Sequence, residues 1–313
     1  MISIYKSMDA PNMLQSVDSV QPGCWINIVA PSDQDLLLIS KKTDVSMEFL
    51  KAALDEEETS RIEMEDNNLL VIVDIPFTEM EDNSLTYDSY PLAIIHTESS
   101  IITVCLKNSK ILTDFIDGKI KSFFTFKRSR FILQVLYRIA SYYLIYLRQI
   151  DKKSLMIEKR LHKSLRNKEL IQLLSLEKSL VYFSTSLKSN EITLEKMLKL
   201  ELLQKYPEDQ DILEDVIIEN KQAIEMANIY SNILTGTMDA FASVISNNLN
   251  IVMKLLASVT IVMAIPNIIF GSFGMNVGGI PFATHPTGFW FVYLIAIVIS
   301  VVATIILKKK NLF

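Results

Sequence analysis

Two stretches near the end of the chain are predominantly apolar and carry no charged residue. They cover residues 255–273 and 289–307, and each approaches the roughly 20 apolar residues that a helix needs to cross a bilayer. The connecting loop, 274–288, has no Lys, Arg, Asp or Glu, whereas lysines precede the first stretch and follow the second. The two stretches predict two transmembrane helices, which we expect in the plasma (inner) membrane. The positive-inside rule predicts that both chain termini lie in the cytoplasm.

The first 106 residues alternate between strand and helix patterns. Short runs of β-branched and apolar residues, bounded by turn residues, predict strands. Ser32 followed by Asp35 predicts a capped helix through residue 40, and 44–60 is typical of further helix. This alternation favours an α/β domain. We expect its strands at residues 24–30, 69–76, 92–97 and 101–106.

From residue 107 the chain is rich in helix-forming residues and nearly free of glycine and proline. Apolar residues at spacings of three and four predict long helices over 130–165 and 167–203. Pro207 marks the start of a third helix, and no strong helix breaker follows it before Pro266. We expect one helix over 207–272 that continues into the first apolar stretch.

Charge divides the chain in the same way. It has 313 residues, of which half are hydrophobic and 21% are charged, against about 25% in a typical soluble domain. No Asp or Glu follows residue 250, and the net charge of −5 argues against a nucleic-acid partner. The sequence predicts an α+β membrane protein in three parts: a cytosolic α/β domain at 1–106, a long-helix region and stalk at 107–250, and a transmembrane domain at 251–313.

Common enzyme signatures are missing from the sequence. It contains no phosphate-binding loop, no HExxH zinc motif, no GxSxG and no CxxC. The three histidines lie far apart, and Cys24 and Cys105 fall in apolar runs typical of buried thiols. We therefore expect no enzyme and no catalytic residue.

The third helix carries a stripe of small, polar or methionine residues as it enters the membrane. Its members follow alternating steps of four and three, a period that keeps one helix face toward a common axis. Close packing of helices and the lining of a pore both explain such a stripe. The stripe consists of Asp239, Ser243, Ser246, Asn250, Met253, Ala257, Thr260, Ala264, Asn267 and Gly271.

Gly274, Met275 and Asn276 follow this helix directly. Gly-Met-Asn at this place, after a proline-containing first span and before a lysine-tailed second span, resembles the CorA family of divalent-cation channels and transporters. The resemblance extends to residues 246–247 and 250–254 at the inner mouth. It also includes Trp25-Ile26-Asn27, Arg61-Ile62-Glu63 and Val73-Asp74-Ile75-Pro76, and so covers essentially the whole chain.

The resemblance implies a homopentamer whose first span lines a pore for Mg²⁺. Gly274, Met275 and Asn276 would form the selectivity filter, whose oxygen dipoles suit a cation that keeps its water. Met253, with Leu256 beside it, would form an apolar gate, and Asp239 would concentrate cations at the pore entrance. The pore-lining residues would be Asn250, Met253, Ala257, Thr260, Ala264, Asn267 and Gly271.

Three carboxylates lie along one face of the stalk: Asp211, Asp215 and Glu219, at steps of four. A solvated acidic face and a metal site both explain this row. In CorA-like proteins, carboxylates between neighbouring cytosolic domains bind Mg²⁺ and hold the closed state, and Asp215 falls at such a position when counted back from Gly-Met-Asn. Asp66 and Asp74 are candidates for its partner.

The expected function is Mg²⁺ influx down the electrochemical gradient, with feedback by cytosolic Mg²⁺. The resemblance implies no covalent cofactor. Whether Co²⁺ and Ni²⁺ are also transported stays open. The external loop lacks the acidic residue of the best-known members, and residues 278–281 resemble the ZntB branch. A proton-coupled Zn²⁺ transporter is therefore the first alternative. His285 fits either a softer metal or plain polar surface. A membrane-anchored sensor that conducts nothing is the second alternative.

Overall fold

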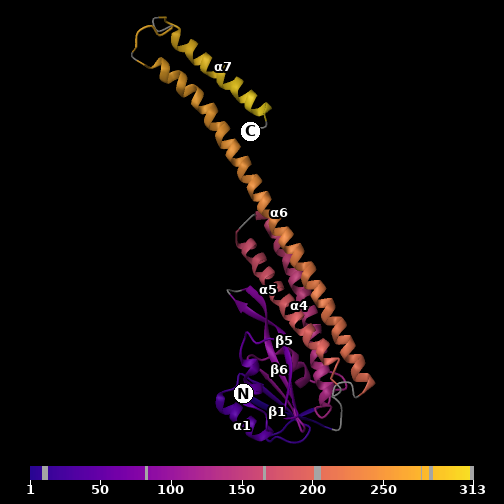
Figure 1. Cartoon of the computed structure of the whole chain (residues 1–313). Helices are drawn as coiled ribbons and strands as arrows, with labels where there is room; N and C mark the ends of the chain where they lie inside the picture. Colours follow the sequence, from indigo (N-terminus) through magenta and orange to yellow (C-terminus); the bar gives the residue numbers. More distant parts are fainter. Residues whose placement is uncertain are drawn as a thin grey trace. The chain divides into compact units, whose positions relative to one another are not determined.

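The computed structural model describes residues 1–8, 13–81, 84–164, 167–200, 206–275, 277–281 and 285–310. The chain forms two compact units, Met1–Gly236 and Thr237–Phe313, and its course is drawn in Figure 1. The first unit holds a seven-stranded sheet and most of the helices, whereas the second consists mainly of two helices. The α+β architecture expected from the sequence is confirmed.

The sheet of the first unit has the strand order β2-β1-β3-β7-β6-β5-β4. All neighbouring strands are antiparallel except β3 and β7, which run parallel. Asp66 and Asn67 join β4 to β5 with φ of 47° and 61°, as a tight hairpin turn requires. The strands are β1 Ile2–Ser7, β2 Leu14–Ser16, β3 Trp25–Val29, β4 Arg61–Glu65, β5 Asn68–Glu81, β6 Ser84–His96 and β7 Ile101–Cys105.

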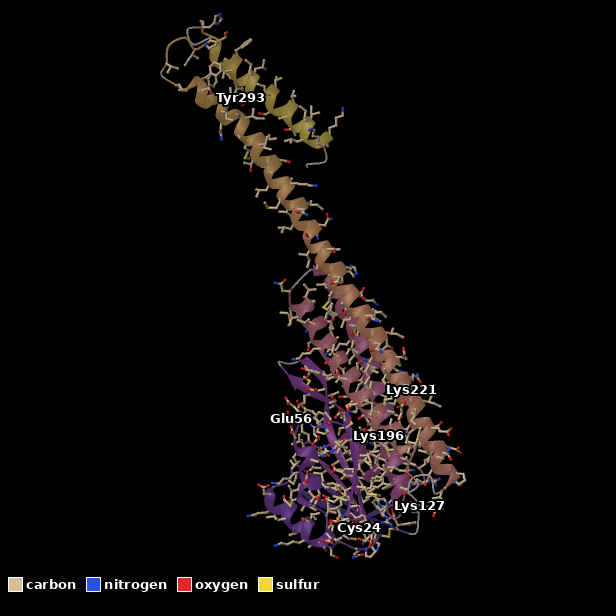
Figure 2. The ribbon with its side chains drawn as sticks, viewed as in Figure 1. Cys24, Glu56, Lys127, Lys196, Lys221 and Tyr293 are labelled. Carbon is tan, nitrogen blue, oxygen red and sulfur yellow. The ribbon has the colours of Figure 1, made fainter. Side chains whose placement is uncertain are left out.

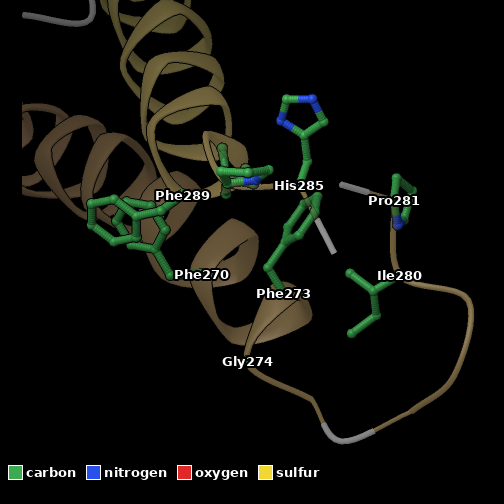
Figure 3. Close-up of a pocket in the computed structure, with 10 residues that line it drawn as sticks. Phe270, Phe273, Gly274, Ile280, Pro281, His285 and Phe289 are labelled. Atoms are coloured by element: carbon green, nitrogen blue, oxygen red, sulfur yellow. The ribbon is translucent and has the colours of Figure 1, made fainter. Parts of the chain in front are cut away.

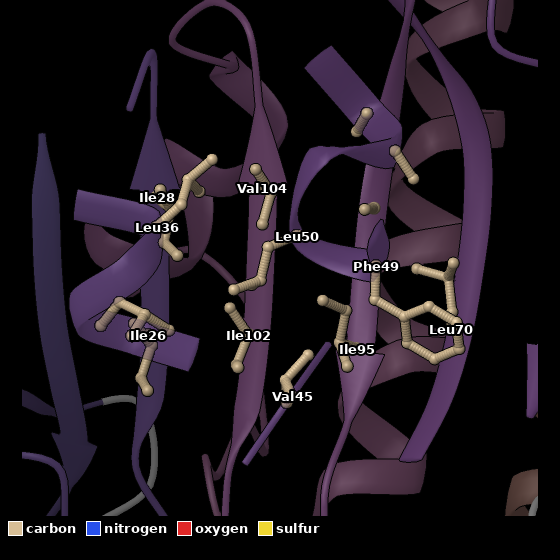
Figure 4. Packing of buried hydrophobic residues seen from close by; sticks show 14 of the residues in the cluster. Ile26, Ile28, Leu36, Val45, Phe49, Leu50, Leu70, Ile95, Ile102 and Val104 are labelled. Carbon is tan, nitrogen blue, oxygen red and sulfur yellow. The ribbon is translucent and has the colours of Figure 1, made fainter. Parts of the chain in front are cut away.

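Helices cover both faces of this sheet. On one face, α1 (Asp33–Thr43), α2 (Met47–Lys51) and the short 3-10 helix η1 (Ala52–Leu54) pack on alternate residues of the strands. Figure 4 shows this core, in which Phe49 and Leu50 meet Ile95 and Ile102. On the other face, α4 (Arg128–Ser164) and α5 (Asn167–Met197) contact β5 and β6. The sheet is therefore the middle layer of three.

The predicted strands are all present, and so is the first helix with its predicted cap. Ser32 Oγ accepts from the Asp35 backbone N–H at 3.3 Å, and the Asp35 carboxylate accepts from the Ser32 N–H at 3.0 Å. The helix expected over 44–60 is wrong. Asp44 adopts a left-handed φ of 55°, Ser46 caps a new short helix, and helical structure ends at Leu54.

The long helices are confirmed. α4 and α5 begin near the expected residues, but α5 ends at Met197 rather than at residue 203, because a turn follows at residues 198–199. α6 runs Pro207–Phe273 and contributes to both units, and α7 runs Gly288–Lys309. A further short helix, α3 (Lys110–Ile116), was not expected.

Candidate ion pathway

The second unit contains the C-terminal part of α6 and the whole of α7. Each helix is long and apolar enough to cross a membrane, and little of either apolar stretch is buried within the chain. Ser258 on α6 and Val292 and Ala296 on α7 are buried. The rings of Phe270 on α6 and Tyr293 on α7 stack at a centroid distance of 6.3 Å (Tyr293 is labelled in Figure 2). One side of α6 therefore packs against α7.

The predicted stripe lies on the opposite side of α6. At 3.6 residues per turn, Ser258 and the half-buried Ile265 and Ile269 share the side that faces α7, and the stripe residues point roughly the other way. The Thr260 hydroxyl donates to the Leu256 carbonyl at 2.8 Å. Within the chain, Ala264 is half-buried, and the exposed members of the stripe include Asn250, Met253, Ala257, Thr260, Asn267 and Gly271.

The expected filter begins where α6 ends. The Gly274 N–H donates to the Phe270 carbonyl at 2.8 Å, and a Cβ atom at Gly274 would lie 3.1 Å from that same oxygen. A side chain at Gly274 would thus crowd the last turn of the helix. Met275 is 57% exposed, and Asn276 lies outside the described residues.

The residues expected to form the gate are large and uncovered in the single chain. Met253 is 55% exposed and Leu256 is 60% exposed. Apolar side chains of this size need lipid or another protein surface around them. Their role as a gate stays a prediction, because it depends on neighbouring copies of the chain.

The acidic row is open to solvent in the single chain. Asp211 and Asp215 are exposed, Glu219 is half-buried, and Asp239 further along α6 is exposed. In the part of the chain that the structure describes, no three or more His, Cys, Asp or Glu side chains gather closely enough to hold a metal ion. The row by itself forms no such group among the described residues, and the regulatory role stays a prediction.

Asp66 and Asp74, the suggested partners of Asp215, lie in different surroundings. Asp66 is exposed at the β4–β5 turn, whereas the Asp74 carboxylate is held by Ser186 of α5. Pro91 lies opposite Asp74 in the sheet. The Asp74 carbonyl accepts from Asn190 Nδ2 at 2.9 Å and from the Tyr143 hydroxyl at 3.2 Å.

This junction ties α4 and α5 to the sheet, and sequence reasoning missed it. Asn190 also accepts from the Asp74 N–H at 2.8 Å. Since β4 begins at Arg61, opposite Ile72, Asp74 lies past the end of β4, and the Asn190 amide pairs with both of its backbone groups where β4 offers no partner. The sequence carried no local signal for it, because Asp74 and Asn190 lie 116 positions apart. Asp74 therefore faces its own α5, which favours a structural role.

Replacing Asp74 with asparagine should stabilise the first unit at neutral pH. Burial raises the pKa of Asp74 to about 6, against a weaker opposing effect of the Ser186 hydrogen bond. With this raised pKa, the folded protein binds the Asp74 proton more tightly than the unfolded chain does. The contribution to the stability of the fold is therefore complete below the ordinary pKa near 3.8 and is lost as the pH rises through about 6. We expect Asp74→Asn to raise the free energy of unfolding by about 1–3 kcal/mol at pH 7.5 and not at pH 3.8.

The measurement is thermal unfolding of the full chain in detergent, followed by circular dichroism. Asp66→Asn is the matched control, because asparagine suits the left-handed turn equally well. His96 contributes the opposite slope, since burial and then Arg128 lower its pKa to about 4. Both proteins contain His96, so its pH dependence cancels when the stability of the variant is compared with that of wild type. If the Asp74→Asn protein is no more stable than wild type at pH 7.5, the raised pKa of Asp74 is contradicted.

A cavity of about 570 Å³ lies where α6, the connecting loop and α7 meet (Figure 3). Phenylalanines and prolines form half of its wall, and its polar side chain is an imidazole. The sequence left His285 open between a site for a softer metal and plain polar surface, and did not indicate a cavity. The wall includes Phe270, Phe273, Gly274, Ile280, His285 and Phe289.

Comparison with known proteins decides the family. The family described as "CorA-like Mg2+ transporter protein" matches residues 21–309. The chain belongs to this family. The CorA resemblance of Gly274-Met275-Asn276 is thereby confirmed, and α6 and α7 carry the membrane spans of this CorA-like protein.

Individual relatives agree with this assignment. The cobalt/magnesium transport protein CorA of Methanocaldococcus jannaschii is 28% identical over 301 residues, which cover 92% of this chain and 90% of the relative. The complete structure of the CorA magnesium transporter from that organism matches with a TM-score of 0.84 at 25% identity, covering 100% of this chain and 99% of the other. The cytoplasmic domain of ZntB from Vibrio parahaemolyticus matches 79% of this chain and 96% of its own at 13% identity, with a TM-score of 0.56; that likeness shows the fold alone.

Proposed function

We propose that the protein is a CorA-type channel through which Mg²⁺ enters the cell down its electrochemical gradient. The observation that carries this proposal is the polar stripe on the side of α6 that α7 leaves uncovered, which ends at Gly274-Met275-Asn276. Polar groups at membrane depth usually face a partner or water. The membrane potential supplies about 4.6 kcal/mol per 100 mV for a divalent ion, enough to drive influx without a second energy source.

The channel would be a homopentamer in the plasma (inner) membrane, with both termini in the cytoplasm. Lys254 before the first span and Lys308 to Lys310 after the second support that orientation. In the assembly the stripes of α6 surround the axis and α7 faces lipid. The proposal includes no enzymatic activity and no nucleic-acid partner.

Each part of the pore would act on the hydrated ion differently. Gly274, Met275 and Asn276 would hold hydrated Mg²⁺ at the outer end through oxygen dipoles. Asn250 would form a second polar ring at the cytosolic end. Met253 and Leu256 would close the pore by dewetting when the stalks move together.

Cytosolic Mg²⁺ would regulate the channel by bridging neighbouring chains at Asp215, with Asp211 and Glu219 on the same face. Asp215→Asn should then raise the Mg²⁺ concentration that protects the first unit from protease by at least about tenfold, because one charged ligand is lost. Glu214→Gln, also exposed but off the row, is the control. Unchanged protection in Asp215→Asn would remove this residue from the sensor.

Flux into proteoliposomes that contain the purified protein tests the function. Mg²⁺ and Zn²⁺ are compared with and without a pH gradient at a fixed membrane potential. We expect the rate of Mg²⁺ influx to depend on the membrane potential and to be the same with and without the pH gradient. Zn²⁺ influx that collapses without the gradient would favour the proton-coupled alternative. Folded oligomer that passes neither ion would favour the non-conducting sensor.

A further inference from the structure

His285 is the one side chain near the filter whose charge can change at ordinary pH. Between Lys254 and Lys308 the sequence has two ionisable residues, His285 and Tyr293. Of the two side-chain types, only histidine changes charge between about pH 5 and 8. His285 lines the cavity of Figure 3 together with Gly274, the first residue of the expected filter.

Two contacts join this imidazole to Thr287. The Thr287 N–H donates to His285 Nδ1 at 3.4 Å, and Thr287 Oγ1 lies 2.9 Å from the same nitrogen. A ring nitrogen can accept a hydrogen bond only while it carries no proton. Protonation of Nδ1 would therefore break the bond from the Thr287 N–H, which lies at the residue just before α7.

A positive charge on His285 would meet no compensating charge nearby. The other residues that line the cavity, from the end of α6, the loop and the start of α7, are Phe, Gly, Ile, Pro and Val, and none of them titrates. The N-terminus of α7 adds a partial positive charge of its own. The field at Gly274 would thus repel an arriving divalent cation.

We propose that His285 is the residue through which external protons slow cation influx. This inference rests on the proposed function, since it takes the loop to be extracellular and the copies of His285 to surround one pore. With Nδ1 unprotonated, the uncharged imidazole accepts from the Thr287 N–H. At acidic external pH its charge lowers the cation concentration at the filter and releases the Thr287 N–H.

The test is Mg²⁺ current in voltage-clamped cells that express the full chain, with the cytosol buffered and external pH lowered from about 7.5 to 5.5. We expect wild-type current to fall by at least about threefold, because a field of one sign changes local cation concentration by that order or more. His285→Gln should keep the same current at both pH values and match wild type at pH 7.5. His162→Gln, on the exposed face of α4, should behave as wild type.

The outcomes separate this inference from the channel proposal. Mg²⁺ current that is equal at both pH values in wild type, or still falls in His285→Gln, overturns the role of His285 and leaves the channel standing. Current that grows on external acidification overturns it too and favours proton coupling. No Mg²⁺ current at either pH, with the protein at the cell surface, overturns both.

Discussion

Replacing Gly271 with leucine is expected to stop Mg²⁺ influx without unfolding the protein. A Cβ atom at Gly271 meets no other part of the chain within 4 Å, so the single chain accepts the larger residue. In the proposed pore, five leucines would form an apolar ring, which a strongly hydrated ion does not cross. We expect influx into proteoliposomes to fall by at least about a hundredfold.

Gly236→Leu is the matched control for this experiment. Gly236 also lies within α6, a Cβ there also meets nothing within 4 Å, and it precedes the apolar stretch. Both substitutions remove a glycine from a helix, so a general effect on helix stability would be shared. Normal influx through Gly271→Leu would show that this side of α6 does not face the ion path.

Replacing Trp25 with alanine should give the largest loss of stability in the first unit. The Trp25 side chain is fully buried, and its ring lies against Phe115, Phe123 and Phe131 at centroid distances of 6.4, 6.3 and 5.1 Å. Truncation would leave a cavity among these rings, and such changes cost about 3–5 kcal/mol. Thermal unfolding of the full chain in detergent measures the loss.

Trp25→Phe separates the volume of the ring from its hydrogen bond. Trp25 Nε1 donates to Thr103 Oγ1 at 2.8 Å, and this hydroxyl in turn donates to Asn27 Oδ1 at 3.0 Å. Phenylalanine retains most of the packing and loses only the donor, at about 1–2 kcal/mol. Equal losses in the two variants would show that packing around Trp25 contributes little.

Local signals explain the elements that the sequence predicted well. The capped start of α1, the proline at the start of α6 and the apolar stretches of α6 and α7 each depend on neighbouring residues. The strands that the sequence did not predict, β1, β2 and β4, lack the buried apolar run that marks the others. β1 pairs with β3, and β4 is a largely exposed edge strand that joins the sheet only through its hairpin with β5.

The candidate site was predictable to the same extent. The 3.5-residue period identified the stripe on α6, because periodicity along one helix is a local property. Which side of α6 meets α7 depends on the rotation of a second helix, and this came only from the burial of Ser258, Val292 and Ala296. The cavity at His285 combines residues from two helices and a loop, so no single segment could indicate it.

Thiol accessibility tests the central claim, that the uncovered side of α6 lines the ion path. Cys24 and Cys105 are buried, so a cysteine introduced at Asn267 would be the main target of a charged, water-soluble thiol reagent. We predict that the reagent blocks Mg²⁺ influx through Asn267→Cys, that Mg²⁺ slows this block, and that Ser258→Cys, on the side facing α7, stays unaffected. Block of Ser258→Cys with Asn267→Cys unaffected would contradict the account.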